Sequence, residues 1–97
     1  MVKYLETENL DDLVKSGLHI VDFYADWCGP CKMMGSVLET MNDVSVIKVN
    51  TDAHPELAQK FGVMSIPTLV FFKDGAEVRK EIGFKSKEEI ERIINNL

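Results

Sequence analysis

The chain has 97 residues, of which 45% are hydrophobic and 28% are charged, and its formal net charge at pH 7 is -5. This length suits one compact domain, which we expect to span residues 1–97, and it is too short for two. The acidic balance argues against binding to nucleic acid or to anionic membranes, because both need an excess of Lys and Arg, so protein or small-molecule partners are expected.

The N-terminal segment predicts a short edge strand followed by a helix. Residues Val2–Leu5 read as the strand, and they carry one basic residue but no long apolar run, which argues against a signal peptide. Thr7 or Asn9 suits the N-cap of the helix and Gly17 suits its C-terminal stop, while its buried stripe would be Leu10, Leu13 and Val14. No stretch of the chain is long and apolar enough for a membrane span, so we expect a soluble, cytoplasmic protein.

Two nearly continuous apolar runs predict central strands. Leu18–Tyr24 and Val44–Val49 are rich in β-branched residues, a pattern typical of parallel strands that are covered on both faces. Between them, Cys31–Met41 forms a helical pattern whose apolar face comprises Met34, Val37, Leu38 and Met41. The order strand, helix, strand predicts a right-handed crossover.

The second half of the chain predicts a short helix and a hairpin. Pro55–Lys60 begins with a proline suited to a first helical turn, and Gly62 follows as a left-handed stop. Thr68–Lys73 and Ala76–Ile82 are strand-like and are separated by Asp74-Gly75, which favours a two-residue type I′ turn. These two strands should be antiparallel.

The C-terminal part completes the predicted fold. In the last strand we expect side chains to alternate between two faces: one face would carry Val78, Lys80 and Ile82, and the other Glu77, Arg79 and Glu81. One of these faces should be exposed to water, as is usual near a sheet edge. Ser86 to Glu89 is a capping box that opens a helix, whose buried side would be Ile90, Ile93, Ile94 and Leu97. The expected class is α/β in the order βαβαβαββα, with a mixed sheet of five strands, or at least four, flanked by about four helices.

Cys28 and Cys31 are the only cysteines and lie where the first central strand leads into the helix. A structural staple is disfavoured, because the entropic stabilisation by a disulfide is smallest for so tight a loop. A zinc clip would need two more ligands, and His19 and His54 lack a finger-like spacing to the cysteines, so no metal is expected. A reversible redox pair is the favoured reading.

The chain resembles the thioredoxin family along nearly its full length. The resemblance rests on residues 21–32, which read Val-Asp-Phe-Tyr-Ala-Asp-Trp-Cys-Gly-Pro-Cys-Lys, on Ile66-Pro67-Thr68, and on the final ββα unit with Gly83. The resemblance implies the thioredoxin fold and a general protein disulfide reductase that cycles a Cys28–Cys31 disulfide through a mixed disulfide, with no bound cofactor. It also implies a monomer that is recharged by a flavin-containing, NADPH-dependent thioredoxin reductase and passes electrons to oxidised protein disulfides.

The two cysteines are expected to have different roles. Cys28 precedes the helix, where free backbone N–H groups and the positive end of the helix dipole stabilise a thiolate, so it would be the nucleophile. Cys31, inside the helix, would be the resolving thiol. Pro30 fits the first helical turn, and Gly29 lets a partner's backbone approach the sulfur.

The resemblance implies that three further segments form the substrate site. It favours Trp27 as a partly exposed wall of that site, with core packing as the alternative. The resemblance implies a cis Ile66–Pro67 bond that brings the loop against the cysteines, where the backbone of Ile66 pairs with an extended substrate. Gly83 would complete this groove.

Asp22 and Lys48 each interrupt an apolar strand. Alternation places Asp22 on a buried face, where burial should raise its pKa, unless local hydrogen bonds satisfy the carboxylate. The resemblance implies that Asp22 accepts the proton of Cys31 through water and that Lys48 tunes it; a snorkelling Lys48 is the alternative. Lys32 is read as a solvated helix residue.

Several features depart from the family pattern. Ser36, next to Gly35, stands where many members have a kinking proline, the segment before Lys48 is shorter than usual, and Tyr24 replaces a frequent tryptophan. Met64, Ser65 and Phe84 give the expected groove a more apolar rim. Two rival functions remain open: an oxidase or isomerase of the same fold, and an adaptor or binding subunit with idle cysteines.

Overall fold

A five-stranded mixed sheet forms the centre of the computed structural model, which describes residues 1–97. The strands lie in the order β1-β3-β2-β4-β5, in which β1, β3 and β2 are parallel while β4 and β5 are antiparallel to their neighbours. The strands are β1 (Val2–Tyr4), β2 (Leu18–Tyr24), β3 (Ser45–Asn50), β4 (Thr68–Lys73) and β5 (Ala76–Ile82). The helices are α1 (Leu10–Leu13), α2 (Gly29–Glu39), α3 (Pro55–Lys60) and α4 (Lys87–Asn95). The expected mixed sheet and element order are confirmed.

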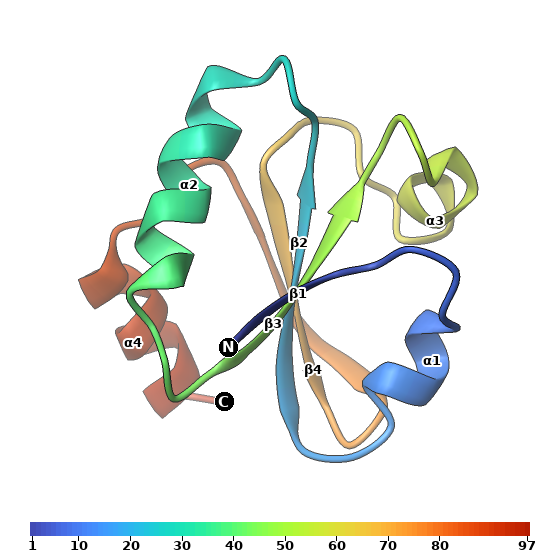
Figure 1. Cartoon of the computed structure of the whole chain (residues 1–97). Coiled ribbons are helices and arrows are strands. Elements are labelled where there is room, and N and C mark those ends of the chain that lie inside the picture. The colour runs from blue at the N-terminus through green and yellow to red at the C-terminus, as the bar shows by residue number, and fades with distance from the viewer.

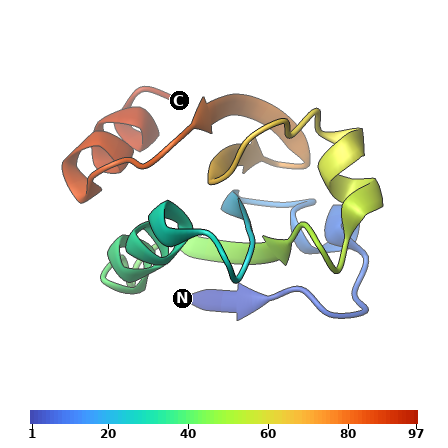
Figure 2. The same ribbon diagram turned by 90° about the horizontal axis from the view of Figure 1, so that it is seen from above.

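The helices cover both faces of the sheet, with α2 and α4 on one side and α1 and α3 on the other (Figures 1 and 2). Side chains alternate along each strand, so β2 sends Ile20 toward α2 and α4 and sends Val21 toward α1 and α3. The first layer also contains Met34, Leu38, Leu69, Phe71 and Ile90. The second contains Leu10, Val14, Phe23, Ile47, Val49, Val70 and Phe72. Asp22 lies two residues after Ile20 on β2, and Lys48 is its register partner on β3, so both side chains point to the sheet face that α2 covers.

Local signals set most of the helix ends. The predicted capping box of α4 is confirmed, because Ser86 Oγ accepts from the Glu89 N–H and the Glu89 carboxylate accepts from the Ser86 N–H. The predicted α3 has the expected bounds and is followed by Gly62 at a φ of +65°. In contrast, α1 ends at Leu13 rather than near Gly17, since Val14 already has non-helical dihedrals. Leu13 is therefore only half-buried, whereas Leu10 and Val14 are buried.

The hairpin between β4 and β5 has the predicted turn. Asp74 and Gly75 have φ values of 50° and 86°, and positive φ at both central positions is the mark of a type I′ turn. The Asp74 carboxylate also accepts a 2.7 Å hydrogen bond from the Gly17 N–H, which ties the turn to the start of β2.

The expected strict alternation in β5 is wrong. Phe71 pairs with Arg79 but Phe72 pairs with Glu77, so Val78 is the extra residue of a β-bulge. The bulge moves Glu77 to the opposite face from Arg79, and no residue of β5 is fully buried. A bulge at an edge strand adds local twist and protects the edge from pairing with another chain.

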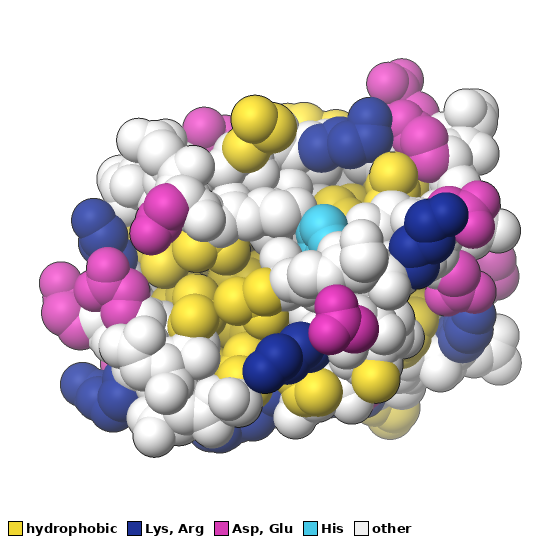
Figure 3. All heavy atoms as spheres, turned by 90° about the horizontal axis from the view of Figure 1, so that it is seen from below, with side chains coloured by type: hydrophobic (Ala, Val, Ile, Leu, Met, Phe, Trp, Pro, Cys, Tyr) yellow, Lys and Arg dark blue, Asp and Glu magenta, His cyan; other side chains and the backbone are white.

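The two ends of the sheet differ in character. The end away from the N-terminus of α2 exposes hydrophobic side chains among charged ones (Figure 3). A surface cavity of about 360 Å³ is lined by Met41, Asp43, Val44, Glu91, Ile94 and Asn95. The cysteines lie at the opposite end of the sheet, where β2 leads into α2 (Figure 1).

None of the helices is sufficiently long and apolar to cross a membrane.

Candidate active site

Cys28 and Cys31 form a disulfide at the N-terminus of α2, with their Cα atoms 5.2 Å apart. Cys28 is the N-cap, and its Sγ accepts the backbone N–H of Cys31 at 3.2 Å. Both residues are buried, with 5% and 2% of their surface exposed, so exposure distinguishes them only slightly. The hydrogen bond is the larger difference, because an N–H donor and the helix dipole both stabilise negative charge on Cys28 once the disulfide is reduced.

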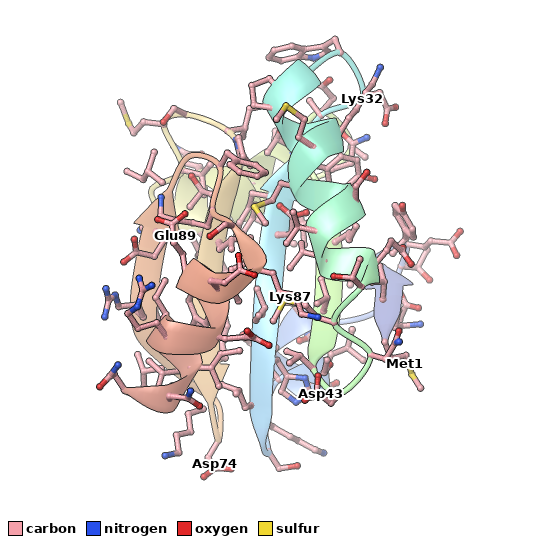
Figure 4. All side chains as sticks on the ribbon, turned by 90° about the vertical axis from the view of Figure 1, so that its left-hand side faces the viewer. Met1, Lys32, Asp43, Asp74, Lys87 and Glu89 are labelled. Carbon is pink, nitrogen blue, oxygen red and sulfur yellow. A yellow bond between two sulfur atoms is a disulfide. The ribbon has the colours of Figure 1, made fainter.

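Gly29 and Pro30 form the first turn of α2. A Cβ at Gly29 would contact nothing within 4 Å, so this position borders open space beside the disulfide. Proline is tolerated here because the first N–H groups of a helix have no partner within it. Lys32 follows on the exposed side, and Figure 4 shows it near the N-terminal end of α2.

Trp27 lies on the surface rather than in the core, with 72% of its surface exposed. Its indole N–H donates a 3.0 Å hydrogen bond to Asp52 Oδ2, which holds the ring beside the cysteines. Asp52 is not among the site residues predicted from the sequence. The predicted parallel pairing of β2 and β3 brings the ends of both strands to the same edge of the sheet, and this would have placed Asp52 near Trp27.

The loop before β4 completes the surroundings of Cys28. The Ile66–Pro67 peptide is cis, and the carbonyl oxygen of Ile66 lies 3.9 Å from Cys28 Sγ. Gly83, at a φ of +91°, donates its N–H to the Pro67 carbonyl at 2.8 Å. The structure thus brings Cys28, Ile66, Pro67 and Gly83 together from three separate segments of the chain.

The rim of this region is apolar. A cavity of about 430 Å³ is lined by Trp27, Thr51, Ala58, Val63, Met64, Ser65 and Ile66. Met64 is 95% exposed, and Ile82, Phe84 and Met33 are also exposed hydrophobic residues. Exposed apolar side chains around a reactive group are typical of a surface that receives another molecule.

Asp22 is fully buried, and no protein group other than Lys48 donates a hydrogen bond to its carboxylate. The local hydrogen bonds considered as an alternative are therefore not found among the protein groups near Asp22. Burial raises the pKa of Asp22, and the nearby positive charge of Lys48 only partly opposes this effect. A buried carboxyl group with a raised pKa is suited to taking up a proton.

Lys48 is the charged neighbour of Asp22. It is 7% exposed, and its Nζ lies 3.2 Å from Asp22 Oδ2. The two residues are register partners on β3 and β2. Lys48 and Cys31 also line a common cavity of about 540 Å³, which lies apart from the apolar cavity next to Trp27.

No group of three or more His, Cys, Asp or Glu side chains is arranged to hold a metal ion. His19 is engaged elsewhere, because its ring nitrogens lie 2.8 Å from the Ser45 hydroxyl and 2.8 Å from the Ser16 carbonyl oxygen.

The fold and the site define a thiol-disulfide oxidoreductase that reduces protein disulfides: a disulfide caps a helix at the edge of a mixed sheet, within an apolar, accessible rim. The thioredoxin family model matches residues 1–96. The chain belongs to the thioredoxin family.

Individual relatives agree with this assignment. The chain is 48% identical over 99 residues to the thioredoxin of Chlamydia caviae, covering 98% of this chain and 97% of the relative. It is 47% identical over 91 residues to that of Staphylococcus saprophyticus, covering 89% and 88%. Among solved structures, a mutant thioredoxin from Halobacterium salinarum matches with a TM-score of 0.89 and 36% identity, covering 98% of this chain and 88% of the other. Malassezia sympodialis thioredoxin matches with a TM-score of 0.84 and 32% identity, covering 99% and 90%. The predicted thioredoxin fold is confirmed.

Two of the departures from the family pattern lie in α2 or directly after it. This helix continues through Gly35 and Ser36 without interruption, and the Ser36 hydroxyl donates to the Lys32 carbonyl at 3.2 Å. The helix ends at Glu39 and β3 begins at Ser45, which accounts for the short connection. Gly35 faces the side chain of Lys48.

Proposed function

We propose that this protein is a general disulfide reductase that carries electrons from a flavin-containing, NADPH-dependent thioredoxin reductase to oxidised proteins. In this role it would act as a cytoplasmic monomer, without a bound cofactor, in electron transport and in cell redox homeostasis. We further propose that the whole chain, residues 1–97, acts as one domain. The observation that carries the proposal is the Cys28–Cys31 disulfide at the N-terminus of α2, beside the Ile66 carbonyl and the apolar cavity next to Trp27.

In the first step of the proposed reaction, Cys28 is the nucleophile. Its thiolate attacks one sulfur of the substrate disulfide, a Cys28–substrate disulfide forms, the substrate S–S bond breaks, and one substrate thiolate leaves. The position of Cys28 as the N-cap of α2 supports this assignment, because the helix N-terminus stabilises the attacking thiolate.

In the second step of the proposed reaction, Cys31 is the resolving thiol and Asp22 accepts its proton. Cys31 loses its proton to Asp22 through water and attacks Cys28 Sγ, and the second substrate thiolate leaves. The dithiol has then given two electrons to the substrate and is left as the Cys28–Cys31 disulfide. The raised pKa of Asp22 supports its part, and Lys48 tunes this acceptor through its positive charge.

Substrate binding is assigned to the groove in front of Cys28. Trp27 forms one wall, Gly29 and Pro30 allow close approach, and an extended substrate segment pairs with the backbone of Ile66. Pro67 holds that segment of the loop, and Gly83 closes the groove. The 3.9 Å separation between the Ile66 carbonyl oxygen and Cys28 Sγ supports this placement.

The reductase is distinguished from an oxidase or isomerase by its reduction potential. Potentials in this superfamily run from about −270 mV for thioredoxin to about −120 mV for DsbA, a span of about 7 kcal/mol for two electrons. We expect the Cys28–Cys31 couple to equilibrate with a glutathione buffer near the reducing end. A potential near the oxidising end would contradict the proposal.

Turnover tests the proposed electron source and the adaptor alternative. With NADPH, a bacterial thioredoxin reductase and a disulfide-containing protein, we expect continuous NADPH oxidation that depends on the chain. The matched control is the Cys28→Ser/Cys31→Ser double variant, which should give none. Equal rates with both would favour an adaptor with idle cysteines.

A further inference from the structure

The Lys48 ammonium lies next to two aromatic rings that pack edge to face against each other. Its Nζ is 4.6 Å from the ring centroid of Tyr24 and 5.7 Å from that of Tyr4. The rings are 6.1 Å apart and nearly perpendicular, at 83°. Both distances fall within the range in which the face of an aromatic ring attracts a cation, and the attraction strengthens when water is excluded.

The sheet register builds this arrangement. Lys48 on β3 is the register partner of Tyr4 on β1 and also of Asp22 on β2, so these three residues form a row across the sheet. Tyr24 lies two positions beyond Asp22 on β2 and therefore points to the same face. The ammonium thus has an aromatic ring on one neighbouring strand and a carboxylate on the other.

Gly35 forms the remaining wall of this enclosure. A Cβ at Gly35 would lie 3.0 Å from Lys48 Nζ, closer than a side-chain carbon normally approaches another atom. Glycine weakens a helix interior, so its place in the middle of α2 is explained by the room that it leaves for the ammonium. A larger residue would push Nζ away from its present position.

The surrounding residues decide where the Lys48 ammonium lies, because other charged groups line the same cavity of about 540 Å³. Asp26 and Glu39 line the same cavity from the β2–α2 connection and from α2, as do the Lys32 ammonium and Cys31. A lysine side chain is flexible and strongly hydrated. Without the rings, Nζ would be free to move toward water and these carboxylates and away from Asp22.

We propose that Tyr4, Tyr24 and Gly35 are positioning residues that hold the Lys48 ammonium against Asp22 and so control proton uptake during resolution by Cys31. The part about proton uptake rests on the proposed function of Asp22. The part about position does not, because it concerns the folded protein alone.

The experiment compares two double variants. Tyr4→Leu/Tyr24→Leu removes both ring faces and keeps apolar bulk, whereas Tyr4→Phe/Tyr24→Phe keeps the rings and removes only the hydroxyl groups. The readout is the titration midpoint of Asp22, followed by NMR of the ¹³C-labelled carboxyl group in the oxidised protein. We expect the Leu pair to raise the midpoint by about half a unit to one unit, a threefold to tenfold change in proton affinity, and the Phe pair to stay near the wild type.

A Lys48→Met background separates positioning from packing. If the rings act through the ammonium, the Leu pair should no longer move the Asp22 midpoint once Lys48 is replaced. A shift of equal size in that background would overturn the proposal, as would an unchanged midpoint in the Leu pair itself. Tyr4→Leu alone provides a milder variant if the pair does not fold, because Tyr4 is 54% exposed; a smaller shift in the same direction is then required.

Gly35→Ala gives an independent test on the opposite wall. We expect it to raise the Asp22 midpoint in the wild type and to leave it unchanged in the Lys48→Met background, and any other outcome contradicts the part assigned to Gly35. The rate of mixed-disulfide breakdown should fall along with each midpoint shift. If Asp22→Asn leaves that rate unchanged, the proposed proton role fails, while the NMR titration still decides whether the rings and Gly35 position Lys48.

Discussion

Lys48 Nζ lies 3.2 Å from Asp22 Oδ2 inside the protein, and no other protein group donates a hydrogen bond to the Asp22 carboxylate. A buried ion pair gains Coulombic energy, but it pays a desolvation cost that only well-formed hydrogen bonds offset. Burial raises the pKa of Asp22 although Lys48 opposes this effect, so the ionised form of Asp22 destabilises the folded state. The relationship explains how the chain keeps a carboxyl group ready to bind a proton.

Asp22→Asn should stabilise the oxidised protein at neutral pH. The pKa of Asp22 is raised above the ordinary value of 3.8, and each unit of that shift costs the fold about 1.4 kcal/mol above the folded-state pKa. The folded state binds the extra proton, so the penalty decreases as the pH falls through the folded-state pKa and vanishes below the unfolded-state value. Urea unfolding at a series of pH values measures this gain.

The control for this prediction is Asp26→Asn, which changes an exposed carboxylate that lines the cavity shared by Lys48 and Cys31. It should alter the free energy of unfolding by no more than about 0.5 kcal/mol, as is usual for surface substitutions. A stabilisation by Asp22→Asn that persists undiminished below pH 3 would contradict the titration argument.

Asp22→Asn should also slow the second chemical step more than the first. An amide cannot take up the Cys31 proton, and general base catalysis contributes about 10²-fold to 10⁴-fold where it operates. Rapid mixing with a chromogenic disulfide would follow formation and breakdown of the mixed disulfide separately. An unchanged rate of breakdown would remove Asp22 from the mechanism.

Cys31→Ser should accumulate covalent complexes with protein substrates, and Cys28→Ser should accumulate none. In the first variant the Cys28 thiolate still attacks but nothing resolves the product. In the second, the remaining thiol lies inside α2 and lacks the N-cap position that stabilises a thiolate, so it is a weak nucleophile. Non-reducing gel electrophoresis after incubation with an oxidised protein measures both. Equal trapping by the two variants would invalidate the assigned roles.

Asp52→Ala should release the Trp27 ring. The 3.0 Å hydrogen bond to Asp52 is the polar contact that restrains this exposed side chain, and its loss is worth about 0.5–1.5 kcal/mol. Trp27 is the only tryptophan, so its fluorescence anisotropy reports its mobility directly. We expect lower anisotropy and a KM for protein substrates that is severalfold higher, whereas Asp52→Asn, which keeps an acceptor oxygen, should resemble the wild type.

Ser86→Ala should destabilise the protein by about 1 kcal/mol, because it removes the hydroxyl that accepts the Glu89 N–H at the start of α4. Thermal unfolding would show the loss as a fall in Tm. Ser36→Ala is the matched control, since that hydroxyl only donates back to Lys32 within an exposed helical turn. A Tm unchanged in both variants would show that the capping box contributes no stability.

Local patterns were sufficient for much of the fold. The apolar run of β2, the Asp-Gly turn and the Ser86 capping box each specify an element through contacts between residues close in sequence. The bulge at Val78 was not predictable in this way, because it depends on how β5 pairs with β4. The pattern of apolar residues also did not predict that α1 ends at Leu13.

The site divides along the same line. Cys28, Cys31 and Asp22, to which we assign the chemistry, were recognisable in the sequence because each stands at a helix start or within an apolar strand. The hydrogen bond from Trp27 to Asp52 and the enclosure of Lys48 by Tyr4, Tyr24 and Gly35 were not. These contacts join separate segments, and only the packing of β1, β3 and β2 against α2 sets the distances on which electrostatic interactions depend.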